Sequence, residues 1–146
     1  VYPGGDVDAF RPWARRGEVV FDGRQGYIRL ALRHGVPVVP VVSEGGHRIF
    51  RVLDDGRRLA RLLRVDKRFR VKVLPISLSV PWGLAVGPVI PLPPPVKITT
   101  VLLPPIAFDR AGAAAAADDA YVAQCAARVE ALMQATLDRL VAERRG

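Results

Sequence analysis

Hydrophobic residues recur at helical spacing at two places along the chain. The first run starts at Tyr27 and ends at His34-Gly35, where glycine is a usual helix stop. The second run starts at Asp118-Asp119 and continues to about Arg145. Its predicted apolar face consists of Tyr121, Cys125, Val129, Leu132, Met133, Thr136, Leu137, Leu140 and Val141. We therefore predict a short helix ending at His34 and a long C-terminal helix over about 118–145.

Two apolar stretches without helical spacing predict strands. Residues 36–42 are all valine or proline, a run without alternation that is typical of a strand buried on both faces of a parallel sheet. The two prolines in it favour the edge or end of a strand. Residues 96–103 form the second run, stopped by Pro104-Pro105. Val1-Tyr2 is the expected end of a further strand, and it leads into a turn at residues 3–5.

This order of strand, helix and strand predicts an α/β fold. We expect a mixed, largely parallel sheet that is flanked by helices and closed by the long C-terminal helix. Within residues 48–72, leucines at helical spacing among arginines predict a short basic amphipathic helix, around residues 57–64. Residues 73–95 are apolar but rich in proline and glycine, so we expect a loop. A membrane span there would leave backbone groups unsatisfied in lipid.

Composition and charge narrow the class of protein. The chain has 146 residues, half of them apolar, which suits one domain with its own core and excludes a disordered tail. A single cysteine excludes an internal disulfide. The net charge is +8, and all of the excess lies in residues 1–72. Such a charge attracts nucleic acid or anionic membranes, but few aromatic residues accompany the arginines, so no specific nucleic-acid partner is expected.

Few residues carry the pattern of a catalytic or metal site. His34 and His47 lie thirteen positions apart without a further ligand nearby, so no zinc site is expected, and His34 is interpreted as a helix C-terminal residue. Cys125 lies on the predicted apolar helix face and is interpreted as core packing. No serine has the G-x-S-x-G setting of a nucleophile. The remaining candidates for a functional site are the glycine-rich turn at residues 3–5 and the cations that follow it.

Four motifs, in order, resemble the glycerolipid acyltransferases of the lysophosphatidate and glycerol-phosphate type. They are Tyr2-Pro3-Gly4-Gly5, Phe10-Arg11-Pro12, the run from Gly23 to Leu32, and Gly35 to Val41. The match is closer to the branch shared with diacylglycerol acyltransferases, where Pro-Gly-Gly replaces Pro-Glu-Gly-Thr-Arg. The strand at 96–103 and the helix that follows also resemble the end of the family's domain, so the resemblance covers nearly the whole chain.

The resemblance implies acyl transfer from a thioester to a glycerolipid hydroxyl at a membrane surface. Family members use a His and an Asp in an H-x-x-x-x-D motif upstream of the Pro-Gly turn, with the His as general base. Five residues after His34 comes Val39, and five after His47 comes Val52, so neither histidine fits. We therefore expect residues 1–146 to be the C-terminal portion of a single acyltransferase domain, without the catalytic pair and inactive alone.

By the same resemblance, five residues are candidates for substrate binding. Gly4 takes the place of the family's acid, and its neighbour Gly5 leaves room for backbone N–H groups to approach an oxygen-rich ligand. Asp6 follows them, and either Arg11 or Arg24 is a candidate cation for the acceptor. A phosphorylated acceptor and a neutral one such as diacylglycerol stay open. No cofactor is expected, because acyl-CoA or an acyl carrier protein supplies the acyl group as a substrate.

The basic stretch 48–72 suits a surface that faces anionic lipid. We therefore expect a cytoplasmic protein that is peripheral to the membrane. The alternative hypothesis is a non-catalytic membrane- or lipid-binding module, which needs only the basic face and the apolar segment 73–95. The oligomeric state, the acyl-chain preference and the true N-terminus do not follow from the sequence.

Overall fold

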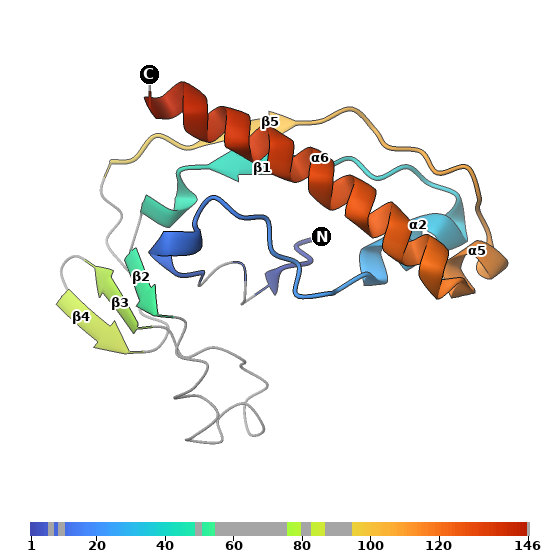
Figure 1. Ribbon diagram of the computed structural model, residues 1–146, viewed down its shortest axis with the longest axis horizontal. Coiled ribbons are helices and arrows are strands. Elements are labelled where there is room, and N and C mark those ends of the chain that lie inside the picture. The colour runs from blue at the N-terminus through green and yellow to red at the C-terminus, as the bar shows by residue number, and fades with distance from the viewer. Residues whose placement is uncertain are drawn as a thin grey trace.

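A computed structural model describes residues 1–5, 8, 11–48, 51–54, 76–79, 83–86 and 95–145. In the described part, a long helix covers a pair of strands at one of its ends and a shorter helix at the other (Figure 1). The elements are η1 (Trp13–Arg15), α2 (Gly26–His34), β1 (Val41–Glu44), η2 (Gly46–Arg48), β2 (Arg51–Asp54), β3 (Ile76–Ser79), β4 (Gly83–Val86), β5 (Thr99–Leu102), α5 (Ala113–Ala117) and α6 (Asp119–Arg145).

Both predicted helices are confirmed. α2 ends at His34, and Gly35 follows in the left-handed conformation with φ 62°. That conformation carries little steric cost for glycine. The N–H groups of Gly35 and Val36 donate to the carbonyls of Leu32 and Ala31 and close the last turn. α6 starts one residue after Asp118, whose Oδ1 accepts a hydrogen bond from the backbone N–H of Tyr121 at 3.0 Å. This bond and the Arg110 side chain lower the pKa of Asp118. Asp118 thus caps the helix and separates it from α5.

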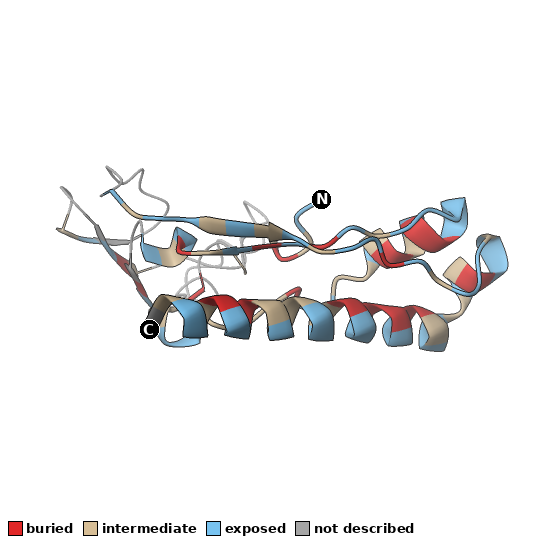
Figure 2. Cartoon of the chain, turned by 90° about the horizontal axis from the view of Figure 1, so that it is seen from above, coloured by how far each residue is buried: buried red, intermediate tan, exposed pale blue. Residues whose placement is uncertain are grey.

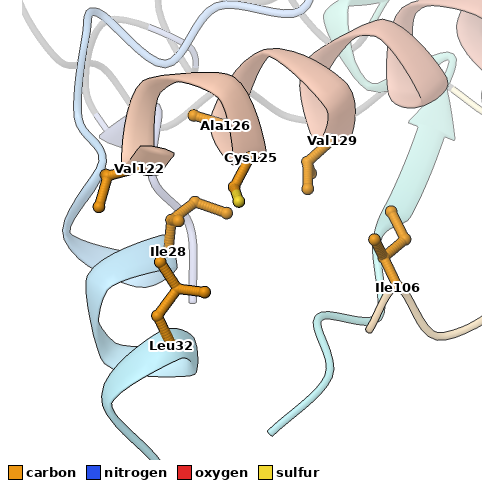
Figure 3. Packing of buried hydrophobic residues seen from close by; sticks show 7 residues of the cluster. All are labelled: Ile28, Leu32, Ile106, Val122, Cys125, Ala126 and Val129. Carbon is orange, nitrogen blue, oxygen red and sulfur yellow. The ribbon is translucent and has the colours of Figure 1, made fainter. Parts of the chain in front are cut away.

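The main core lies between α2 and the first half of α6. Ile28 and Leu32 of α2 face Val122, Cys125 and Val129 of α6, as Figure 3 shows. Cys125 is buried in this cluster, as predicted. The buried face of α6 differs from the predicted one, because Val122 and Ala126 are buried in the core whereas Leu132 is 42% exposed. Figure 2 shows the buried face of α6 turned toward the strands and α2.

A second cluster lies between the β1–β5 pair and the later part of α6. Val42 of β1 packs against Leu137 and Leu140, with Val101 of β5 beside them. β1 and β5 run antiparallel, with Val41 opposite Leu102 and Ser43 opposite Thr100. Burial of the 36–42 stretch on both faces is not seen in the described part, where Val39 and Val41 are both 48% exposed. In the β1–β5 pair, α6 packs against the face that carries Val42.

The second sheet contains β2, β3 and β4, all antiparallel to their neighbours. β3 and β4 fall within 73–95, so the prediction of a loop is wrong for these residues. The alternation in Ile76–Ser79 suits a strand, and Pro75 and Pro81 lie outside the paired positions. Every strand pair in the described part is antiparallel, and the mixed, largely parallel sheet stays a prediction.

No strand forms at Val1-Tyr2, which are 97% and 93% exposed. The predicted basic helix at 57–64 lies outside the described residues. No helix in the described part is long and apolar enough to cross a membrane.

Candidate functional site

The N-terminal turn is tightly packed and is held by an arginine. The N–H of Gly5 donates to the carbonyl of Tyr2 at 3.2 Å, which confirms the predicted turn. Arg24 Nη1 donates to the carbonyls of Pro3 and Gly4 at 3.2 and 3.0 Å. Gly4 is buried, and a Cβ there would collide with the Asp8 side chain and lie 2.6 Å from the Val20 carbonyl. The glycines of the turn therefore allow close packing, and Arg24 fixes its shape.

Arg11 is the most deeply buried cation of the described part. Its side chain is only 7% exposed, although it carries a full charge. Its Nη2 lies 3.3 Å from Oδ1 of Asp8 and 2.8 Å from Nε2 of His47. Its Nε and Nη1 have no hydrogen-bond partner within the described part of the chain. A buried cation with open donors is costly unless an acceptor completes its shell, so Arg11 is suited to bind an anionic or oxygen-rich ligand.

The contact between Arg11 and His47 fixes the state of the histidine. A guanidinium has only donors, so Nε2 of His47 must accept, and its proton lies on Nδ1. Burial and the Arg11 charge together lower the pKa of His47 to about 4, which keeps the ring neutral at physiological pH. Burial also lowers the pKa of Arg11, whereas the Asp8 carboxylate opposes that shift. Burial raises the pKa of Asp8 against the opposing effect of Arg11.

An apolar cleft of about 760 Å³ opens beside this cluster. Its walls come from the N-terminal turn, from α2, from residues 36–43 and from the face of α6 around Met133. Tyr27 and Phe21, whose rings meet edge to face at 5.6 Å, lie in the same wall. Burial, with the nearby Glu130 charge, raises the pKa of Tyr27 to about 12, so its hydroxyl remains a proton donor. The cleft combines a long apolar lining with a few polar groups, which suits a lipid chain.

A smaller polar pocket of about 200 Å³ also has Arg11 in its lining. Arg16 and Arg48 contribute further cations to its lining. Arg16 is held against the Trp13 ring, with the guanidinium carbon 4.4 Å from the ring centroid. Glu44 is the acid of this pocket, and it is paired with Arg144 at 2.7 Å. The two hollows share Arg11, Ser43 and Leu137 in their linings and are therefore adjacent.

The structure brings only part of the predicted site together. Gly4 and Arg11 line the cleft, whereas Gly5 and Arg24 are engaged in the turn. Asp6 lies outside the described residues. Sequence reasoning missed Asp8 and His47 as partners of Arg11. Asp8 is three residues from Arg11, a spacing that carries a weak signal, but His47 is 36 residues away and no motif links the two.

No group of acidic, histidine or cysteine side chains that could hold a metal ion occurs in the residues that the structure describes.

The profile of the family described as diacylglycerol acyltransferase matches residues 1–135. No curated protein and no solved structure matches the chain.

Proposed function

Because the chain belongs to the diacylglycerol acyltransferase family, we propose that it forms part of an enzyme that transfers an acyl group from a thioester to a glycerolipid hydroxyl. Acyl transfer and lipid biosynthesis follow from the family. We further propose that the thioester donor is acyl-CoA or an acyl carrier protein, that the acceptor is a glycerolipid, and that transfer takes place at a membrane surface.

The cleft beside Arg11 is the observation that carries this proposal. An acyl chain needs an apolar channel, and the linings from α2, residues 36–42 and α6 supply one. The polar end of the substrate needs a donor at the mouth of that channel, and the open N–H groups of Arg11 meet this need. Of the two candidate cations, Arg11 or Arg24, we therefore propose that Arg11 binds the substrate and that Arg24 shapes the turn.

The general base is proposed to come from sequence that precedes residue 1. His47 does not suit the role, since its Nε2 accepts from Arg11 and its lowered pKa makes it a weak base. We propose that the preceding segment carries the His and Asp of the family motif. In the same proposal, β1 and β5 belong to the mixed, largely parallel sheet of the complete domain.

A peripheral, cytoplasmic position at the membrane remains a proposal supported by charge. Residues 48–72 hold ten Lys or Arg and three Asp, and each cation near an anionic surface contributes about 1 kcal/mol. Sedimentation with vesicles that contain anionic lipid tests it: binding that falls with salt is expected. Binding that ignores both anionic lipid and salt would argue against this position.

The enzymatic proposal is tested on the full-length polypeptide with labelled acyl-CoA. Vesicles supply diacylglycerol, monoacylglycerol or lysophosphatidate as acceptor, and lipid products are separated and counted. We expect labelled glycerolipid from at least one acceptor. If the protein binds vesicles but transfers no acyl group from acyl-CoA or from an acyl carrier protein, the result would instead support a non-catalytic lipid-binding module.

A further inference from the structure

The lining of the polar pocket suits a different chemical group from the lipid chain that the apolar cleft suits. A neutral glycerolipid needs only an apolar channel and a few hydrogen bonds. The polar pocket, which shares Arg11 with the cleft, is instead lined by Arg16, Arg48 and the neutral His47. Its volume of about 200 Å³ is several times the roughly 30 Å³ that one water molecule occupies in the liquid. There is room for a group larger than a single water.

The charges of this pocket favour an anion. Three arginines face it, and the acid among its lining residues, Glu44, is compensated by Arg144 at 2.7 Å. Arg48 lies farther from Glu44, with 3.8 Å between Nε and Oε1, and its side chain is 46% exposed. Asp8 offsets part of the Arg11 charge from the side of the cleft, at 3.3 Å. The pocket therefore retains an excess of positive charge beside a buried guanidinium.

Arg11 itself needs further acceptors. Its Nη2 is used by His47 and Asp8, while Nε and Nη1 are buried without a partner in the part of the chain that the structure describes. Phosphate offers several charged oxygens to a guanidinium, and such charge-assisted bonds are short and strong. His47 holds one edge of Arg11, which reduces the ordering needed when a ligand binds.

We infer that the polar pocket binds the phosphate group of an amphiphile whose apolar chain lies in the adjoining cleft. Arg11 contacts the phosphate at the boundary of the two hollows, and Arg16 and Arg48 complete the pocket. This inference rests on the proposed function, because it names the charged group of one of its substrates. The phosphate belongs either to the acyl acceptor or to the phosphorylated carrier of the thioester donor.

The test compares ligands that differ only in phosphate. Lysophosphatidate and monoacylglycerol with the same chain are titrated into the full-length protein below their micelle concentrations. Trp13, which stacks on Arg16, reports binding by fluorescence in a background where Trp82 and any other tryptophan of the full-length protein are replaced by Phe. We expect lysophosphatidate to bind about ten-fold more tightly or better, as hydrogen bonds to charged groups predict. Inorganic phosphate is expected to compete with it.

Two variants and a matched control locate the effect. Arg11→Gln and the more exposed Arg48→Gln should each reduce the preference for the phosphorylated ligand several-fold. Arg139→Gln removes an arginine on α6 that is 61% exposed and should leave the preference unchanged. Arg48→Gln keeps the test decisive if Arg11→Gln does not fold. Equal affinity for the two ligands, or a preference that survives Arg48→Gln, would overturn the inference and leave a pocket filled with water.

A second arm separates the two sources of the phosphate. Coenzyme A, which has phosphates but no acyl chain, is titrated against the same variants. Competition by coenzyme A, lost in Arg48→Gln, assigns the pocket to the donor; competition by glycerol phosphate alone assigns it to the acceptor. Absence of phosphate preference with acyl transfer intact refutes only this inference. Phosphate preference without any acyl transfer refutes only the proposed function.

Discussion

Nη2 of Arg11 lies 2.8 Å from Nε2 of His47, and this contact requires the histidine to be neutral. A second ring proton, added at Nε2, would turn this acceptor into a donor. The resulting imidazolium cation would then lie beside the Arg11 guanidinium. In the unfolded chain His47 does not contact Arg11, so it titrates near the ordinary pKa of 6.5. The neutral form of His47 is thus part of the folded state.

Stability should therefore fall as the pH falls from 6.5 toward 4. In this window the unfolded state binds a proton that the folded state excludes, because the folded pKa of His47 is about 4. Between pH 6.5 and 5, the loss is expected to reach up to about 2 kcal/mol. Urea unfolding at several pH values measures it.

His47→Gln is the matched comparison for this pH dependence. The variant should lose most of the slope between pH 6.5 and 5. Asp8 contributes in the opposite direction, because its raised pKa gives stability that is lost as the pH rises, but its contribution is present in both proteins. Identical slopes in the two proteins would contradict the burial of a neutral His47.

The N-terminal turn should tolerate no side chain at Gly4. A Cβ there meets the Asp8 side chain and, at 2.6 Å, the Val20 carbonyl, which belongs to the backbone and cannot rotate away. Gly4→Ala is expected to lower the free energy of unfolding by about 1–3 kcal/mol. Gly26→Ala at the start of α2 is the control, since nothing lies within 4 Å of its Cβ position. A Gly4→Ala protein as stable as the control would show that the turn is packed differently.

Gln134 of α6 should hold the loop that precedes α2. Its Oε1 accepts from the Val19 N–H at 2.8 Å, and its Nε2 donates to the Gly17 carbonyl at 2.7 Å. Gln134→Ala leaves both backbone groups without these partners, at an expected cost of about 1–3 kcal/mol. Gln124→Ala removes an exposed glutamine from the same helix and should be nearly neutral. If thermal unfolding shows the two variants to be equally stable, the hydrogen bonds of Gln134 do not hold the loop.

The corrected face of α6 predicts unequal effects of two truncations. Val122 is fully buried, and Val122→Ala is expected to cost about 2 kcal/mol. Leu132 is 42% exposed, so Leu132→Ala should cost less although it removes more atoms. Denaturant unfolding of both variants measures the difference. A larger loss of unfolding free energy for Leu132→Ala would support the buried face that the sequence predicted.

How much the sequence could predict depended on how local each signal was. α2 and α6 could be predicted because spacing and caps lie within each segment. The exact face of α6 could not, because the helix packs on α2 near Val122 and on β1 near Leu137, and its buried stripe shifts between these partners. Strands β3 and β4 were missed because the prolines around them indicated a loop. Arg11 was identified as a candidate cation, but its contact with His47 depends on folding alone.

Photochemical labelling tests whether the cleft beside Arg11 receives the acyl chain. A fatty acyl thioester with a diazirine on its chain is bound to the full-length protein and irradiated, and labelled peptides are mapped by mass spectrometry. We expect label in α2, in residues 36–42 and on the α6 face near Met133, and we expect unlabelled thioester to suppress it. Label on the exposed side of α6 near Leu132 and Arg139, or label that the competitor does not reduce, would contradict it.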